Sequence, residues 1–257
     1  MIISLINLSN GELQDREIQV VIRAINRQIA EDFMPYWSIG AILRLEGHGD
    51  TVAHKQNLAD MRGDAVIYLW NKSDVADAIG YHERNNAGIP YGFVFLDIAK
   101  ELGEDWSVTL SHEALELIAD PEVNLLVAGP HPDPAKEYDV FFWYEMSDPV
   151  QNDSYLIDGV SVSNFILPLY FTSGDEFDGR NDFLGSSLKS FNINPGGYVG
   201  FFDPQIKGHT TYSRQGDAVA QKRIQIKGKL EKTRRAIRYQ GRGGKRKSSA
   251  QEGAASN

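Results

Sequence analysis

The sequence predicts an α+β protein with a mixed β-sheet, a long N-terminal helix and a second helix that bears the candidate site. Three observations favour this fold class. Apolar residues change from strand-like runs to helical spacing and back along the first half of the chain. The chain has 257 residues, which is long enough for a self-supporting core. After residue 121 it becomes rich in Gly, Pro, Asp, Asn and aromatic residues, which predicts irregular β structure and long loops.

The first part of the chain predicts a strand followed by a helix. Residues 2–8 are apolar and predict a short buried strand. Apolar side chains then recur at three- and four-residue spacing, which predicts one apolar stripe on a helix of roughly 18 residues. The members of this stripe are Leu13, Ile18, Val21, Ile22, Ile25, Ile29 and Phe33. Pro35 is expected to end the helix, and a β-rich run is expected from Trp37 to Leu45.

Two more strands and a second helix are expected before residue 121. The strands are predicted at 64–70 and 91–97, and the segment 74–90 between them is expected to be a loop because it is rich in Gly and Asn. The second helix is predicted at 106–119, because Pro121 prevents its continuation. The order of strand, helix and three strands predicts a layer in which one helix packs on a sheet.

Beyond the second helix we expect short strands that close over the first layer. The strand-like runs are 138–144, 155–162, 164–171 and 197–202. We therefore divide the chain into a domain at 1–216 and a basic tail at 217–257, which is expected to be disordered from about residue 241 because it lacks large apolar side chains. Within the domain, 1–121 forms the sheet and helices and 122–216 forms the loop-rich and β-rich closing part.

Charge is distributed unevenly along the chain. The sequence has 26 Lys and Arg against 35 Asp and Glu, a formal net charge of −9. Residues 221–257 contain twelve basic and two acidic residues, so this segment carries +10 and the other 220 residues carry −19. An acidic body joined to a basic tail indicates that the two parts have different partners or bind each other.

The composition excludes several classes of protein. The chain has no cysteine, which excludes disulfide scaffolds, Cys-ligated zinc, iron–sulfur clusters and thiol catalysis. No apolar run approaches the ~20 residues of a transmembrane helix. Residues 1–6 lack the basic region and cleavage site of a signal peptide. We therefore expect a cytoplasmic protein without membrane contact, or a virion-associated one if a phage encodes it.

The second predicted helix carries a His-Glu-x-x-Glu motif. His112 and Glu116 are four residues apart and therefore lie on one side of a helix, where they could share a metal ion. Glu113 could act as general base on a metal-bound water, as in the zincin motif. The second histidine of that motif is here Glu116. A carboxylate is a harder ligand than imidazole, so Zn²⁺ is expected but Mn²⁺ and Ca²⁺ remain open.

The alternative interpretation of this motif is an ordinary surface helix whose Glu side chains face water. Two observations favour a buried helix beside a cleft. The strand-like run before the helix has a glycine-rich approach, as a substrate-aligning edge strand would have. Apolar residues occupy most of the other sides of the helix, and buried acidic side chains need partners or a cation. These apolar residues are Leu110, Ala114, Leu115, Leu117 and Ile118.

A third protein ligand is expected among the acidic residues. Glu145 and Asp148 follow an aromatic strand and are the two main candidates. Asp120 is an alternative, because it lies two turns beyond His112 on the same face. Without a metal, Glu145 would cap a turn and Asp120 would make a turn with Pro121.

Three other residues are candidates for the cleft. His82 lies before the expected edge strand and could face the cleft, although a surface position is the alternative. Tyr144 and Tyr155 could stabilise an oxyanion, and aromatic packing is the alternative for both.

The chain resembles a family of uncharacterised bacterial and phage-associated proteins that have a zincin-like domain. The resemblance covers roughly residues 1–202 and implies a metallopeptidase-like fold, with His112 and Glu116 as metal ligands and Glu113 as the base. The chain beyond about residue 215 lies outside the resemblance. The matching segments are the opening strand and helix, 32–37, 80–82, 91–95, 111–113 with Glu116, 120–121, Glu145, 148–150, 153–155, 158–160, 162–165 and 196–198.

Two functions are compatible with these features. The first is a metal-dependent hydrolase, specifically a metallopeptidase that acts on a peptide or protein substrate. The second is a non-catalytic, phage-type structural or assembly protein that retains a zincin-like fold. In either case the tail could bind nucleic-acid phosphates, unless it is a solvated segment or lies on the acidic body. The basic tail residues concerned are Lys222, Arg223, Arg234, Arg235, Arg242, Lys245, Arg246 and Lys247.

Overall fold

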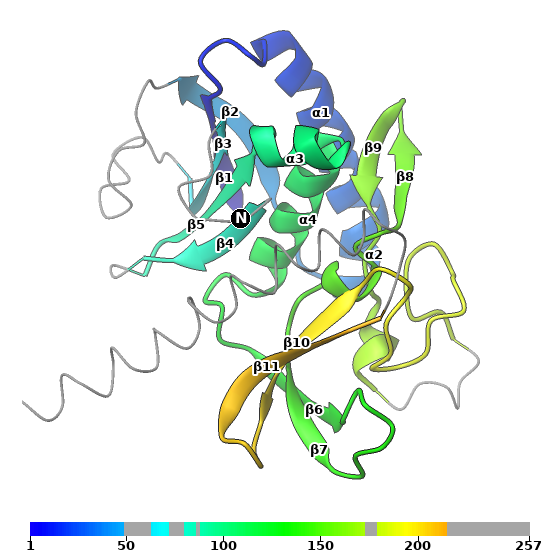
Figure 1. Ribbon diagram of the computed structural model, residues 1–257. Coiled ribbons are helices and arrows are strands. Elements are labelled where there is room, and N and C mark those ends of the chain that lie inside the picture. Colours follow the sequence, from blue (N-terminus) through cyan, green and yellow to red (C-terminus); the bar gives the residue numbers. More distant parts are fainter. Residues whose placement is uncertain (49–62, 72–79, 86–87, 173–178, 215–257) are drawn as a thin grey trace, which may run out of the picture.

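A five-stranded mixed sheet forms one side of the molecule (Figure 1). The computed structural model describes residues 1–48, 63–71, 80–85, 88–172 and 179–214. The strand order is β2-β1-β3-β5-β4, in which β4 is the antiparallel edge strand and the other pairs are parallel. The strands are β1 (Ile2–Leu8), β2 (Ile42–His48), β3 (Ala65–Trp70), β4 (Gly80–Arg84) and β5 (Pro90–Phe95).

The central strands are covered on both faces, which explains their sequences. Every residue of β5 is buried, as are almost all residues of β1 and β3. Parallel strands with two covered faces have continuous apolar runs rather than alternating ones. The strands predicted at 2–8 and 64–70 are therefore confirmed with small changes at their ends.

The N-terminal helix is longer than predicted. Helix α1 (Asp15–Arg27) continues through a π-helical segment, η1 (Gln28–Phe33), into α2 (Met34–Trp37). The prediction that Pro35 ends the helix was wrong. Pro35 lies directly after the π-helical segment, in the first turn of α2, a position that tolerates proline. The helix ends at Ser38, whose φ of 55° is left-handed, so β2 begins later than predicted.

The edge of the sheet also differs from the prediction. The segment 74–90 was expected to be a loop, but it contains β4, which pairs with β5 along its whole length. Its short polar sequence lacks the apolar alternation that would have predicted a strand. Its position at the sheet edge comes from backbone pairing with β5. β5 is therefore an internal strand and not the expected edge strand. It ends at Phe95, where an unpredicted helix, α3 (Leu96–Leu102), begins.

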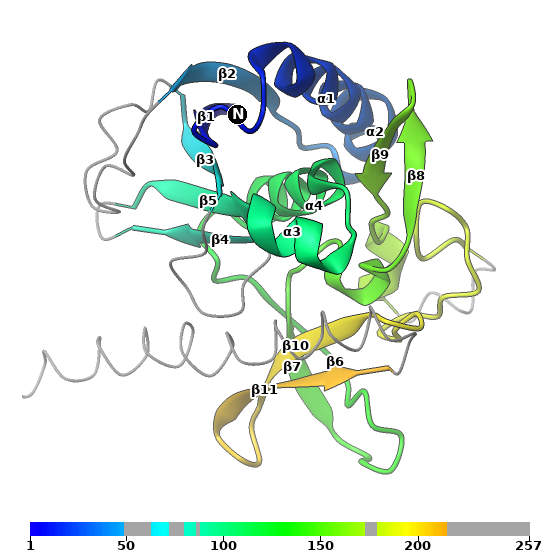
Figure 2. The same cartoon turned by 45° about the horizontal axis from the view of Figure 1, so that its top comes forward.

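Helix α4 (Trp106–Ala119) has the predicted bounds and lies at the centre of the fold. It lies between the five-stranded sheet on one side and the hairpin of β8 (Ser154–Ile157) and β9 (Val160–Ser163) on the other (Figure 2). All its residues after Trp106 are buried. No helix in the described part of the chain is long and apolar enough to cross a membrane.

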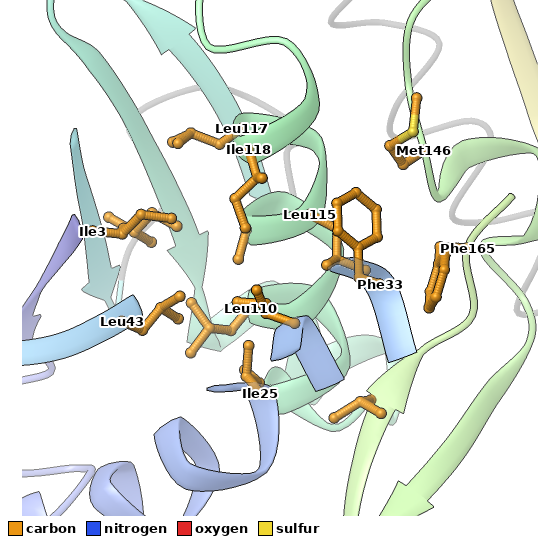
Figure 3. Close-up of a cluster of buried hydrophobic side chains, with 14 of the residues drawn as sticks. Ile3, Ile25, Phe33, Leu43, Leu110, Leu115, Leu117, Ile118, Met146 and Phe165 are labelled. Carbon is orange, nitrogen blue, oxygen red and sulfur yellow. The ribbon is translucent and has the colours of Figure 1, made fainter. Parts of the chain in front are cut away.

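The apolar core forms around α4. In Figure 3, Leu110, Leu115 and Ile118 of α4 point toward side chains from the sheet, the N-terminal helix and the segment after β7. All of the core residues labelled there are at most 5 % exposed. Those that are labelled from the other elements are Ile3, Ile25, Phe33, Leu43, Met146 and Phe165. The packing holds α4, and therefore its motif, at one position.

The second half of the described chain contains short strands, as predicted, in a four-stranded antiparallel sheet of order β11-β10-β7-β6. The runs at 138–144 and 197–202 are confirmed as strands. The run at 155–162 is a hairpin that turns at Asp158, and the run at 164–171 is not a strand but ends in a 3₁₀ helix. The elements are β6 (Leu126–Pro130), β7 (Asp139–Trp143), η2 (Asp148–Val150), η3 (Pro168–Phe171), β10 (Tyr198–Asp203) and β11 (Gly208–Ser213).

Candidate metal centre

The motif on α4 is buried. His112, Glu113 and Glu116 are 5 %, 3 % and 3 % exposed. The alternative of an ordinary surface helix is therefore wrong for this segment. Buried carboxylates and imidazoles require hydrogen bonds, opposite charges or a cation, so their neighbours decide what the motif can do.

One group of potential metal ligands forms around His112. Its Nε2 atom lies 3.1 Å from Oε1 of Glu116 and 3.1 Å from Oδ1 of Asp148. Asp148 begins η2, shortly after β7, and is 3 % exposed. The backbone N–H of Ser147 donates to the same Glu116 oxygen at 3.2 Å and fixes its orientation. These three side chains offer ligand atoms within 4.8 Å of one another and could hold a metal ion.

A second group forms around His82, which β4 brings against α4. Its Nδ1 atom lies 3.4 Å from Oε2 of Glu113 and 3.8 Å from Oε2 of Glu116. Its Nε2 atom lies 3.8 Å from Oε2 of Glu145. His82, Glu113 and Glu116 also offer ligand atoms within 4.8 Å of one another, so the two groups share Glu116. We call the five side chains of the two groups, together with Glu145, the carboxylate–histidine cluster.

Glycine allows β4 to approach α4 closely. A Cβ atom at Gly80 would lie 2.8 Å from Cγ2 of Thr109 and 2.9 Å from Oε1 of Glu113. Both distances are shorter than real Cβ contacts, so a larger residue would push β4 away from the helix. Gly80 therefore sets the distance between His82 and the motif on α4.

The electrostatics of the cluster are dominated by its carboxylates. Burial lowers the pKa of His82, but the negative charges of Glu145, Glu113 and Glu116 outweigh burial and raise it to about 9. The imidazole therefore carries a positive charge at neutral pH in the metal-free protein. The cluster contains four carboxylates and two histidines, all with side chains at most 10 % exposed. Such an excess of buried negative charge suits a divalent cation.

The structure separates the three acidic residues that were candidates for the third ligand. Asp148 faces His112, and Glu145 faces His82 instead. Asp120 belongs to neither group, because its carboxylate accepts hydrogen bonds from the backbone N–H groups of Asn124 at 3.1 Å and Leu125 at 2.9 Å. Asp120 therefore makes the turn that was its alternative role.

The two tyrosine candidates are both packed among aromatic side chains. Tyr144 stacks on Phe171 at 4.9 Å between ring centroids, and burial with the charge of Asp120 raises its pKa. The Tyr155 hydroxyl donates to Asp32 at 2.7 Å and accepts from Nε2 of Gln28 at 3.2 Å. Because its hydroxyl already has these two partners, Tyr155 is a poor candidate for oxyanion stabilisation.

A buried hydrogen-bond network that the sequence did not indicate lies behind the motif. Oε1 of Gln28, in η1, accepts from the Ser111 hydroxyl at 2.7 Å, and its Nε2 donates to the Ser163 carbonyl at 2.8 Å. The Ser163 N–H in turn donates to the Ser111 hydroxyl at 3.1 Å. Because Ser111 precedes His112, this network fixes the orientation of α4 beside the cluster. No sequence motif marks Gln28 for this role.

The eight basic tail residues lie outside the residues that the structure describes. The segment from about residue 241, which was predicted to be disordered, also lies outside them. A comparison of the chain with protein-family models found no match, and neither did a comparison with curated proteins. What the site does must therefore be inferred from its own geometry and charge.

Proposed function

We propose that the protein is a metal-dependent hydrolase in which His112, Glu116 and Asp148 hold a zinc ion and Glu113 is the general base. The observation that carries the proposal is the buried group in which His112 Nε2 lies 3.1 Å from both carboxylates, with Glu113 on the same helix. One imidazole and two carboxylates are an acceptable ligand set for zinc, and also for manganese.

The chain's own residues suit the hydrolysis of a carbonyl substrate. A bound zinc ion supplies Lewis acidity toward the carbonyl oxygen and the attacking water. Glu113 takes a proton from that water at a carboxylate oxygen and passes it to the leaving amine. Nδ1 of His82 lies 3.4 Å from Oε2 of Glu113 and orients that carboxylate. Burial of the cluster excludes bulk water and strengthens these interactions.

The edge strand supports a peptide or protein as the substrate. Within the described residues β4 is an edge strand of the sheet, pairs with β5 only, and lies against α4 beside the cluster. An extended peptide can add to such an edge through backbone hydrogen bonds. A mixed sheet with an antiparallel edge strand, next to a helix that carries His-Glu-x-x-Glu, also favours a zincin-like fold.

A small cavity next to the carboxylates has room for little more than a water molecule. Apart from Glu145 and Asp148 its walls are apolar and mostly aromatic. The other lining residues are Phe142, Trp143, Pro149, Tyr170, Phe171, Val199 and Gly200.

Replacement of the base tests the proposal. With zinc supplied to the full chain, Glu113→Gln is expected to lower cleavage of a mixed peptide library by about 10²- to 10⁴-fold, because the amide cannot accept the proton. Glu12→Gln makes the same chemical change at an exposed position and should cleave like the wild type. Equal cleavage by Glu113→Gln and the wild type, with zinc bound to both, would show that the mechanism is wrong.

The second candidate function is a non-catalytic, phage-type structural or assembly protein. Glu116 in place of the second histidine of the zincin motif favours it, because a carboxylate makes the bound metal a weaker Lewis acid. Elemental analysis of protein purified without chelator separates the two functions. A stable chain that contains no metal and binds none when zinc is added would favour the structural function.

The basic tail is a separate proposal, for which the charge of +10 over residues 221–257 is the support. We expect it to bind nucleic-acid phosphates, with an affinity that falls steeply as salt rises. Deletion of 221–257 should abolish DNA retention at low salt. If the truncated chain retains as much DNA as the full chain, the tail is not the segment that binds DNA.

A further inference from the structure

The two carboxylate oxygens of Glu116 face two different histidines. Oε1 lies 3.1 Å from His112 Nε2 and accepts the Ser147 N–H at 3.2 Å. Oε2 lies 3.8 Å from His82 Nδ1. A carboxylate that faces separate imidazoles in this way can bridge two cations, and metal ions in two-metal sites are typically ~3.5–4 Å apart. Glu116 can therefore act as a bridging ligand of two cations and not only as a terminal ligand of one.

His82 provides an independent observation. Its side chain is 5 % exposed, and its Nε2 atom makes no hydrogen bond within the described part of the chain. This nitrogen points toward Glu145, whose Oε2 is 3.8 Å away, a distance too long for a hydrogen bond. A buried imidazole nitrogen without a hydrogen bond is costly in a finished protein interior. Such a nitrogen is expected at a site where the imidazole or its neighbours bind a ligand.

The charge of the cluster points the same way. Four carboxylates lie beside the two histidines. A cation at His112, Glu116 and Asp148 uses only two of these carboxylates as ligands, and the other two, Glu113 and Glu145, lie beside His82. Carboxylate oxygens and an imidazole nitrogen are suitable ligands for a second divalent cation.

We propose that a second divalent cation binds between His82, Glu113 and Glu116, and that Glu116 bridges it to the first cation. The three side chains offer ligand atoms within 4.8 Å of one another.

The second cation has a consequence for activity, and this part rests on the proposed function. Glu113 is the general base in the form with one cation, but it becomes a ligand in the form with two. A carboxylate that binds a cation is a much weaker proton acceptor. The form with one cation is therefore active and the form with two is inhibited, so that excess metal lowers the rate of hydrolysis.

Titration of the metal-free full chain with Co²⁺ tests the second position directly. Calorimetry and the visible absorption of Co²⁺ should show two equivalents bound to the wild type, the second more weakly. His82→Asn should bind one equivalent and lose affinity for the second by more than the ~100-fold that loss of an outer partner can cost. His112→Asn should lose the tighter equivalent. Binding of a single equivalent by the wild type, or of two by His82→Asn, overturns the proposal.

Two further variants keep the result interpretable. His131→Asn replaces another buried histidine, whose Nδ1 accepts the Asp133 N–H, and the Asn side-chain oxygen can accept that bond. It should bind two equivalents. If His82→Asn does not fold by circular dichroism, Glu113→Gln serves instead, because it keeps the side-chain volume and removes a charged ligand of the second position only. Undiminished binding of the second equivalent by Glu113→Gln would also overturn the proposal.

The rate of peptide cleavage separates this inference from the proposed function. Activity should rise up to one equivalent of Co²⁺ and fall as the second binds, and the fall should be lost in His82→Asn. Two bound equivalents without any cleavage would refute the hydrolase and leave the second cation position standing. Cleavage that is inhibited by excess Co²⁺ equally in the wild type and His82→Asn would refute the second position and leave the hydrolase standing.

Discussion

Helix α4 borders two buried polar regions that begin at adjacent residues. The regions differ in how their polar groups are paired with hydrogen-bond partners or opposite charges. Ser111 belongs to the network of Gln28, Ser163, Tyr155 and Asp32, which we call the Gln28 network. In it the amide of Gln28 uses its oxygen as an acceptor and its nitrogen as a donor to two oxygens. The next residue, His112, belongs to the carboxylate–histidine cluster, where four carboxylates face two imidazoles.

This difference distinguishes a polar region that stabilises the fold from one that is poised for a ligand. A satisfied buried network contributes to stability and to a single arrangement of its elements. A buried cluster with excess like charge costs stability until a cation binds. Sites with a function commonly retain such a cost. Substitutions in the two regions should therefore change stability in opposite directions.

The largest effect is expected from Gln28→Ala. The substitution leaves the Ser111 hydroxyl and the Ser163 carbonyl without their partner in the interior, and opens a cavity. We expect the free energy of unfolding to fall by about 3 kcal/mol or more. Urea denaturation of the full chain measures it. Gln19→Ala, at an exposed position of α1, is the matched control and should change stability by less than about 0.5 kcal/mol. A similar small change in Gln28→Ala would mean that the network does not stabilise the fold.

The next effect is stabilisation by metal. Zinc at about 100 times its dissociation constant should raise the free energy of unfolding of the wild type by about 2.7 kcal/mol, since only the folded chain presents the site. The same increment should appear in Gln28→Ala, provided that this variant folds, because Gln28 is not a ligand. It should vanish in His112→Asn. Thermal unfolding with and without zinc measures it, and an unchanged increment in His112→Asn would remove His112 from the site.

Glu116→Gln should have the opposite sign to Gln28→Ala. Its amide oxygen can still accept the Ser147 N–H. Removal of one of four like charges should stabilise the metal-free chain by about 1–2 kcal/mol. Urea denaturation in the presence of chelator measures this gain. A loss of stability would show that the cluster is balanced without a cation, and would weaken the comparison with the Gln28 network.

The centre of the fold could be predicted from the sequence because its signals are local. Proline at 121 and the apolar faces set the bounds of α4, and the spacing of His112 and Glu116 put them on one side of it. Asp148 was one of three open candidates for the third ligand, with Glu145 and Asp120. Only the packing of η2 against α4 brings it, and not Glu145, to His112.

The rest depends on contacts between distant segments. β4 has a polar sequence, and only its pairing with β5 makes it a strand. His82 was expected in a loop, where it could face the cleft or lie at the surface, but its place against Glu113 depends on that pairing and on the close approach at Gly80. Gln28 lies 83 residues from Ser111 in sequence, in a π-helical segment that no local pattern predicts. Long-range partners of this kind have no signal in a single sequence.

The smallest expected effect tests the outer end of the Gln28 network. Tyr155→Phe removes a hydroxyl that donates to Asp32, but Asp32 is only partly buried and can bind water instead. Gln28 Nε2 keeps its bond to the Ser163 carbonyl. We therefore expect a loss of about 1 kcal/mol in the free energy of unfolding, and no change in zinc affinity. Calorimetric titration with zinc is the decisive measurement, because the hydroxyl has no contact with the cluster that metal binding would use. A clear loss of zinc affinity in this variant would mean that the two regions of α4 are coupled, and the distinction between them would fail.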